Sequence, residues 1–303
     1  LTTIGGSLEI DRNEQLIFLD GFPNLTQLQR FELRDTNIRA IRSFGVQQIT
    51  DNLIIENNPG LQSISGFERL IRAREVAISR NPMLRTITGF NALAEAEGLY
   101  LEENEALASA EFPSLTQIRS IRVERNRSLE TMPNMPALIA VSDDITVTEN
   151  QSMTRLDGFD ALQAINNIRV LNNQELGAIS GFTNLGAVNG DIMIESNENL
   201  ASLTGFDNLA TAENIFLNGN TALSDFTAFQ ALERIQMLVL RGSRDLVDIS
   251  TFNRLNNVVR ELSIESLDSL EALSGFNALT NADQLQIRFN PALSTVTGFR
   301  NLE

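Results

Sequence analysis

The chain has 303 residues, 42% of them hydrophobic, and a formal charge of −16 at pH 7, so a nucleic acid or anionic membrane partner is not expected. It contains no Lys, His, Cys or Trp, and all 23 of its cationic side chains are Arg. Without thiolate, imidazole or amine groups, the sequence predicts no cofactor, no ordinary zinc or iron site and no enzymatic activity.

A short apolar–variable–apolar triplet recurs along the whole chain at intervals of 22 to 24 residues. In chain order the thirteen triplets are 8–10, 31–33, 53–55, 76–78, 99–101, 121–123, 145–147, 168–170, 192–194, 215–217, 238–240, 262–264 and 285–287. Successive side chains of a strand point to opposite faces, so the outer residues of each triplet are expected in a core and the middle residue in solvent. The fixed period predicts one strand per turn of a solenoid.

An Asn follows each triplet at a fixed distance in ten of the thirteen rungs. These residues are Asn13, Asn58, Asn81, Asn104, Asn126, Asn150, Asn173, Asn197, Asn220 and Asn290. Thr36, Ser243 and Leu267 take the place in the other three rungs. An amide side chain can satisfy turn N–H and C=O groups and can bond an identical amide in the next rung. We therefore expect a buried, structural Asn ladder.

The second half of each rung carries a Phe, except in one rung that has Met135. Gly precedes this Phe in eight rungs, and Leu follows it three residues later in nearly all. We expect the Phe column to fill the side of the coil opposite the strands, and the Gly to permit a positive φ at a corner. Together the repeats predict a mainly β, parallel solenoid of thirteen rungs with little helix, spanning 1–303 as a single domain.

The pattern apolar-x-apolar-x-x-Asn-x-x-Leu, followed by Gly-Phe-x-x-Leu, resembles the leucine-rich-repeat superfamily. Within it, the Asn-x-x-Leu spacing is similar to that of receptor L-domain repeats. The match is seen in Leu-Ile-Ile-Glu-Asn-Asn-Pro-Gly-Leu at 53–61 and Ile-Met-Ile-Glu-Ser-Asn-Glu-Asn-Leu at 192–200. The resemblance implies a right-handed, horseshoe-like solenoid, an extracellular or cell-surface location, and recognition or adhesion through variable surface residues. The cysteine caps of those receptors are missing here.

The middle residues of the triplets form a central column on the exposed strand face. In chain order they are Glu9, Glu32, Ile54, Ala77, Tyr100, Arg122, Thr146, Arg169, Met193, Phe216, Val239, Ser263 and Gln286. Aromatic and Arg side chains are common anchors of interfaces, and contiguous exposed apolar patches mark contact surfaces. The candidate ligand-binding residues, for a protein or glycan ligand, are therefore Tyr100, Arg122, Thr146, Arg169, Met193, Phe216 and Val239. Ordinary β propensity also favours such residues on an open sheet.

Rungs four to six are rich in Arg although the chain is acidic. The residues are Arg69, Arg72, Arg74, Arg80, Arg85, Arg119, Arg122, Arg125 and Arg127. They could receive a carboxylated or sulfated glycan, but a solvated ion-pair network is the favoured interpretation. The glycosylation motif Asn-x-Ser/Thr begins at Asn24, Asn126 and Asn150. Because Asn126 and Asn150 belong to the ladder, only Asn24 is a plausible glycosylation site.

Two alternatives to a recognition module remain open. Neither end of the repeat array carries a polar cap, so the natural protein is expected to continue beyond 1–303, and the rod could serve as a structural spacer that self-associates end to end. A more remote alternative is a polysaccharide-active β-helix enzyme, but every rung is short and no inserted loop would enclose a cleft. No apolar run approaches the roughly 18 residues needed to span a bilayer, so direct membrane insertion is not expected.

Overall fold

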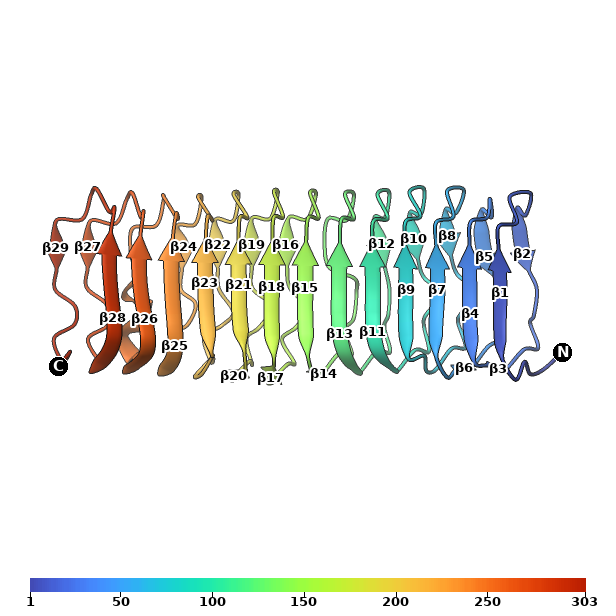
Figure 1. Cartoon of the computed structure of the whole chain (residues 1–303), viewed down its shortest axis with the longest axis horizontal. Helices are drawn as coiled ribbons and strands as arrows, with labels where there is room; N and C mark the ends of the chain where they lie inside the picture. Colours follow the sequence, from blue (N-terminus) through green and yellow to red (C-terminus); the bar gives the residue numbers. More distant parts are fainter. The chain divides into compact units, whose positions relative to one another are not determined.

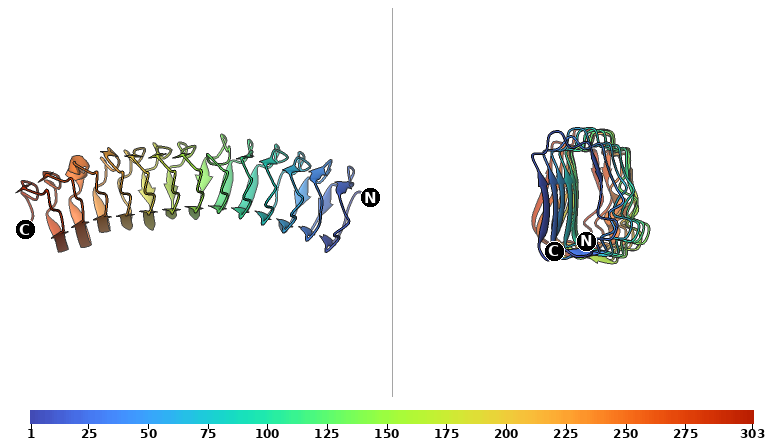
Figure 2. Two further views of the ribbon diagram at one scale, coloured as in Figure 1. Left: turned by 90° about the horizontal axis from the view of Figure 1, so that it is seen from above. Right: turned by 90° about the vertical axis from the view of Figure 1, so that its right-hand side faces the viewer.

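The computed structural model describes residues 1–303, apart from the side chain of Asp20. The chain divides into two compact units, unit 1 (Leu1–Met153) and unit 2 (Thr154–Glu303). In each unit every rung is one turn of a coil, with a long strand on one wall and, in most rungs, a short strand behind it (Figures 1 and 2). The predicted parallel solenoid is confirmed. That the two units form one domain stays a prediction.

The long strands coincide with the thirteen triplets. In unit 1 they are β1 (Ser7–Asp11), β4 (Arg30–Arg34), β7 (Asn52–Glu56), β9 (Glu75–Ser79), β11 (Glu95–Glu102), β13 (Gln117–Glu124) and β15 (Asp144–Thr148). In unit 2 they are β18 (Asn167–Leu171), β21 (Asp191–Glu195), β23 (Asn214–Asn218), β25 (Arg234–Arg241), β26 (Asn257–Glu265) and β28 (Asn281–Arg288). Within each unit, neighbouring long strands pair in parallel and bring corresponding triplet residues side by side, as in Leu53↔Val76 and Ile192↔Ile215.

Short strands complete the coil and also pair in parallel from rung to rung. On the wall behind the long strands of unit 1 lie β2 (Phe18–Asp20), β5 (Ala40–Arg42), β8 (Ser63–Ile64), β10 (Thr86–Ile87) and β12 (Ser109–Ala110). The equivalent strands of unit 2 are β16 (Arg155–Leu156), β19 (Ala178–Ile179), β22 (Ser202–Leu203), β24 (Asp225–Phe226), β27 (Ala272–Leu273) and β29 (Thr295–Val296). Before some long strands come β3 (Gln27–Leu28), β6 (Gln48–Ile49), β14 (Ala140–Val141), β17 (Ala164–Ile165) and β20 (Ala187–Val188).

Helix is scarce, as the short rungs predicted. Among the described residues the only helix is η1, a short 3₁₀ helix over Ser250–Arg254.

Two β-turns per rung explain the Asn-x-x-Leu and Phe-x-x-Leu spacings. The Leu84 N–H donates to the Asn81 carbonyl at 3.0 Å, and the Leu93 N–H donates to the Phe90 carbonyl at 3.2 Å. The same pair of bonds joins Leu200 to Asn197 and Leu209 to Phe206 in unit 2. Each motif is therefore a four-residue turn closed by an i to i+3 hydrogen bond, which fixes the distance between its first and last residues.

The residue before each ladder position adopts the left-handed conformation, which the sequence analysis did not anticipate. These residues are Arg12, Asp35, Asn57, Arg80, Glu103, Arg125, Glu149, Asn172, Ser196, Gly219, Gly242, Ser266 and Phe289, all with positive φ. Only two of them are Gly, although this conformation costs other residues roughly 1–2 kcal/mol. The hydrogen bonds of the ladder residue that follows must therefore stabilise the left-handed conformation at each corner.

The Asn ladder is buried and unbroken from Asn58 to Asn150 in unit 1 and from Asn173 to Asn220 in unit 2. The Oδ1 of Asn81 accepts the backbone N–H of Asn58 at 3.0 Å, and its Nδ2 donates to the Ile55 carbonyl at 3.0 Å. The pattern repeats from Asn104 to Asn150 in unit 1 and from Asn173 to Asn220 in unit 2, where each side chain is fully buried. In the second rung Thr36 takes the ladder position, and its hydroxyl donates to Asn58 Oδ1 at 2.7 Å.

The ladder prediction is wrong for Asn13 and holds only in part for Asn290. Asn13 is exposed and its Nδ2 donates within its own rung, to the Asp11 carbonyl. Asn290 is half-buried, although its Oδ1 accepts the Leu267 N–H at 2.9 Å. Asn13 follows the first of the thirteen triplets and Asn290 follows the last, whereas the fully buried Asn residues of the ladder all lie between them.

The Phe column packs in the interior as predicted. In unit 1 the rings of Phe67 and Phe90 stack with centroids 5.3 Å apart and planes 13° apart. In unit 2 the rings of Phe159 and Phe182 lie 5.2 Å apart at 12°. Met135, which replaces Phe once, is 5% exposed, so an apolar side chain of similar reach fills the same space.

The predicted role of the Gly before Phe is wrong for most rungs. Only Gly158 and Gly205 of these glycines have positive φ, whereas in several rungs the Phe itself adopts it. The requirement is instead one of space: a Cβ on Gly89 would lie 2.6 Å from the carbonyl carbon of Ser65, and one on Gly181 would lie 2.5 Å from the Asp157 Cα. At most of these positions Gly is needed because adjacent rungs approach backbone to backbone, whereas beside Gly21 and Gly158 no atom lies within 4 Å of where a Cβ would be.

Candidate binding surface

The strand face of unit 1 brings three predicted site residues together. Tyr100 of β11 pairs in register with Arg122 of β13, and Arg122 pairs with Thr146 of β15. The guanidinium carbon of Arg122 lies 5.5 Å from the centroid of the Tyr100 ring, within the range of a cation–π contact. Arg122 is exposed, whereas Tyr100 and Thr146 are half-buried.

Tyr100 lies down on the sheet instead of projecting from it. A Cβ on Gly98, two residues earlier on the same face of β11, would lie 2.5 Å from both the Cζ and the hydroxyl oxygen of Tyr100. The missing side chain at Gly98 therefore leaves the space that the outer end of the ring occupies. One side of the ring faces the sheet, and the half-buried residue offers the remainder to solvent.

The position of Tyr100 raises the pKa of its hydroxyl above the ordinary value of 10.0, chiefly through burial and then through the negative charge of Glu75. The cations Arg122 and Arg119 oppose the shift. Because Tyr100 is the only tyrosine, ultraviolet titration of the folded chain should give one midpoint above pH 10. The neutral hydroxyl then contributes stability that is complete below pH 10 and is lost as the pH rises through the folded-state pKa. A midpoint at or below that of the chain in urea would contradict this placement.

The Arg-rich rungs form the ion-pair network that the sequence favoured. Arg122 lies 3.5 Å from both Glu102 and Glu124, and Arg125 lies 2.9 Å from Glu149. The hydrogen bond from Arg125 is the main reason that the pKa of Glu149 is lowered. Arg72, Arg74, Arg80 and Arg119 also pair with carboxylates. In the part of the chain that the structure describes, only Arg69, Arg85 and Arg127 of this group form no ion pair.

In unit 2 the predicted residues form a row across four strands. Arg169 of β18 pairs with Met193 of β21, Met193 pairs with Phe216 of β23, and Phe216 pairs with Val239 of β25. All four side chains are half-buried, because residues on neighbouring strands cover their flanks. Met193, Phe216 and Val239 therefore form a half-buried apolar strip with Arg169 at one end.

The expectation that Ser263 is exposed is wrong. Ser263 is 3% exposed. It lies between Val239 and Gln286 in register, and its hydroxyl donates to Glu265 Oε1 at 3.1 Å. The larger neighbours on both sides cover the small Ser side chain.

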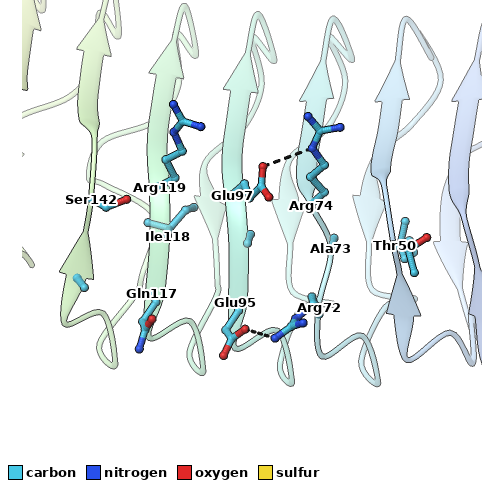
Figure 3. Close-up of a pocket in the computed structure, with 13 residues that line it drawn as sticks. Thr50, Arg72, Ala73, Arg74, Glu95, Glu97, Gln117, Ile118, Arg119 and Ser142 are labelled. Atoms are coloured by element: carbon cyan, nitrogen blue, oxygen red, sulfur yellow. Dashed lines mark hydrogen bonds and ion pairs between the residues drawn. The ribbon is translucent and has the colours of Figure 1, made fainter.

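Unit 1 also contains a groove that the sequence analysis did not identify. It encloses about 460 Å³ beside the amino-terminal ends of the long strands and crosses five consecutive rungs (Figure 3). Its floor is made by small or buried apolar residues, namely Ala73, Ala96 and Ile118. One rim carries Arg72, Glu95 and Gln117, and the other carries Arg74, Glu97 and Arg119.

The charges of the rims are paired across neighbouring rungs. Arg72 pairs with Glu95, and Arg74 Nε lies 3.3 Å from Glu97 Oε2. Arg74 Nη1 also bonds Asp51 Oδ1 at 3.1 Å; this bond is the largest cause of the raised pKa of Arg74. The sequence does contain a signal for this groove, because the segment Arg-Ala-Arg at 72–74 is followed one rung later by Glu-Ala-Glu at 95–97. The charged residues have the same spacing within both segments and opposite signs, so the pattern predicts that the two segments pair.

The described residues contain no group of three or more Asp, Glu, His or Cys side chains placed to hold a metal ion. Within the same residues, no helix has the length and the apolar character required to cross a membrane.

No protein-family model matches the chain. No curated protein matches it either. Among solved structures, TLR13 in its complex with ssRNA13 is similar over 90% of this chain, with 17% identity and a TM-score of 0.33. The matched region is 47% of the TLR13 chain, so this chain spans about half of that length. A leucine-rich repeat protein from Bacteroides ovatus ATCC 8483 is similar over 94% of this chain and 79% of its own, with 13% identity and a TM-score of 0.29.

Proposed function

We propose that this leucine-rich-repeat-like solenoid is a non-catalytic recognition or adhesion module that binds a protein or a polysaccharide through its strand face, outside the cell or at its surface. The observation that carries the proposal is the Tyr100–Arg122 pair. It sets the only tyrosine of the chain flat on an open parallel sheet, beside an exposed guanidinium. Aromatic and Arg side chains are the residues that most often dominate binding energy at interfaces.

The form of the surface supports binding over catalysis. Most central side chains of the strand face, such as Tyr100, Met193 and Phe216, are half-buried between their neighbours. Among the described rungs, each 22 to 24 residues long, no inserted loop encloses this face to exclude water. Its charges are held in ion pairs such as those of Arg122 with Glu102 and Glu124. Held in this way, side chains are oriented before a partner arrives, which lowers the entropic cost of association.

The proposal is tested by attachment of the whole chain, coupled to beads, to surfaces coated with a panel of polysaccharides and proteins. Tyr100→Ala and Phe216→Ala should each reduce attachment, because they remove an aromatic side chain from the strand face of unit 1 and of unit 2, respectively. Phe18→Ala is the matched control, since Phe18 is 64% exposed on β2, behind the long strands. Melting temperatures, measured in parallel, exclude loss of folding as the cause.

Undiminished attachment of both face variants would contradict the proposal. If attachment instead depends on self-association of the chain and is unaffected by these substitutions, the spacer alternative is the better account.

A further inference from the structure

We propose that the groove of unit 1 binds an extended, uncharged, hydroxyl-rich polysaccharide whose chain crosses successive rungs, with the Tyr100 ring as a stacking platform at the groove's edge. This inference rests on the recognition function proposed above and specifies its ligand class. Gly98, on which the ring lies, directly follows Glu97 of the groove rim, so the platform and the groove adjoin.

The balance of charges in the groove favours a neutral ligand. The groove and its direct partners carry three guanidinium groups, from Arg72, Arg74 and Arg119, against four carboxylates, from Glu95, Glu97, Asp51 and Asp143. The groove is therefore almost neutral, within a chain of net charge −16. An anionic ligand would meet carboxylates that already occupy the guanidinium groups and would be repelled by the chain as a whole. A neutral ligand does not compete with these carboxylates and is not repelled by the net charge of the chain.

The paired side chains of the rims keep hydrogen-bonding capacity for hydroxyl groups. A guanidinium has five N–H donors and a carboxylate has about four acceptor positions, so an Arg–Glu pair retains several of each after pairing. The pairs Arg72–Glu95 and Arg74–Glu97, with Gln117, offer donors and acceptors along both rims (Figure 3). A hydroxyl both donates and accepts, so hydroxyl groups can use this mixed set fully.

The polar groups of the rims recur from rung to rung. Adjacent strands of a sheet lie about 4.8 Å apart, so the three rungs of each rim present polar groups at that interval. The register Arg72↔Glu95 and Glu95↔Gln117 shows that corresponding rim residues align. A polymer of identical ring units can repeat one set of contacts at successive rungs, whereas a compact ligand would use one or two rungs.

An extended peptide suits the groove less well. Peptides that lie along a sheet gain affinity by pairing with free backbone groups at a strand edge. Here the backbone beside the groove is already used between rungs: the Arg74 N–H donates to the Asp51 carbonyl at 3.0 Å, and the Glu97 N–H donates to the Arg74 carbonyl at 2.7 Å. The groove therefore offers side chains and an aromatic face, which suit sugar rings better than a peptide backbone.

The test measures binding of cellohexaose and an N-acetylglucosamine hexamer, the matching disaccharides, and a galacturonic acid hexamer to the whole chain by calorimetry. At least one neutral hexamer should bind at least about tenfold more tightly than its disaccharide, because it spans more rungs; tenfold corresponds to ~1.4 kcal/mol. Its affinity should be nearly independent of salt, since the rim charges are paired.

Two variants locate the site. Ala96→Phe fills the groove floor and should weaken hexamer binding at least about tenfold, whereas Ala108→Phe, at an exposed position outside the groove lining, should leave it unchanged. Circular dichroism and melting temperature check folding; if Ala96→Phe fails to fold, Gln117→Ala, which trims a rim donor, replaces it and should also weaken binding.

Several outcomes would overturn the inference. These are wild-type affinity of a folded Ala96→Phe chain, a preference for the galacturonic acid hexamer, or no binding of any neutral hexamer. If one of them occurs while Tyr100→Ala still reduces attachment to a coated surface, only the groove assignment fails. If no surface in the panel retains the chain either, the proposed recognition function fails as well.

Discussion

Replacing Phe182 by Ala should destabilise unit 2 by about 3–5 kcal/mol, the usual cost of truncating a buried Phe. Phe182 is fully buried and stacks on Phe159 at 5.2 Å and on Phe206 at 4.9 Å. In a solenoid each rung is stabilised only by its nearest neighbours, so one cavity weakens two rung interfaces at once. Urea denaturation followed by far-ultraviolet circular dichroism measures the loss.

The matched control is Phe289→Ala in the same unit. Phe289 is 78% exposed, so its truncation should change the free energy of unfolding by no more than about 0.5 kcal/mol. Similar losses at Phe182 and Phe289 would show that the Phe column does not form the core of the coil.

Replacing Asn81 by Ala should cost about 2–5 kcal/mol, because at least two buried backbone groups lose their partners at ~1–3 kcal/mol each. Asn81 Oδ1 accepts the Asn58 N–H, and its Nδ2 donates to the carbonyls of Ile55 and Ser79. The same substitution also removes the side-chain hydrogen bonds that stabilise the preceding residue, Arg80, in its left-handed conformation. The loss is measured by denaturation in urea.

Asn91→Ala provides the comparison for this substitution. Asn91 is exposed in the second turn of the same rung, and its recorded contact is made by its backbone carbonyl, which accepts the Ser114 hydroxyl and is retained after the substitution. Its substitution should be nearly neutral. An Asn81→Ala chain as stable as the Asn91→Ala chain would rule out a structural role for the ladder.

The repeat made most of the fold predictable from sequence. Apolar residues at both ends of each triplet can share a core only if the middle residue faces outward, so the inside and the outside of every long strand follow from the pattern. The fixed Asn offset predicted a buried ladder for the same reason. Asn13 departs from this prediction because the pattern fixes the distance of each Asn from its triplet and not the burial of its side chain.

The details that were missed depend on distances between rungs. The Gly89 position looks like a flexible corner in sequence, but the structure shows a backbone approach that leaves no room for a Cβ. Tyr100 could be placed on the strand face, yet its orientation depends on the empty space at Gly98 two residues away. The groove is formed by three columns of residues from five rungs. Its only sequence signal is the pair of oppositely charged segments Arg-Ala-Arg at 72–74 and Glu-Ala-Glu at 95–97.

The central claim is that the strand face around Tyr100 binds the partner, and the fluorescence of this residue tests it most directly. The chain has one Tyr and no Trp, so its intrinsic tyrosine fluorescence reports Tyr100 alone. Titration with whichever partner the coated surfaces identify should change this fluorescence saturably and reduce its quenching by acrylamide, with the midpoint that calorimetry gives for binding. Binding detected by calorimetry that leaves both the fluorescence and the quenching of Tyr100 unchanged would contradict the account.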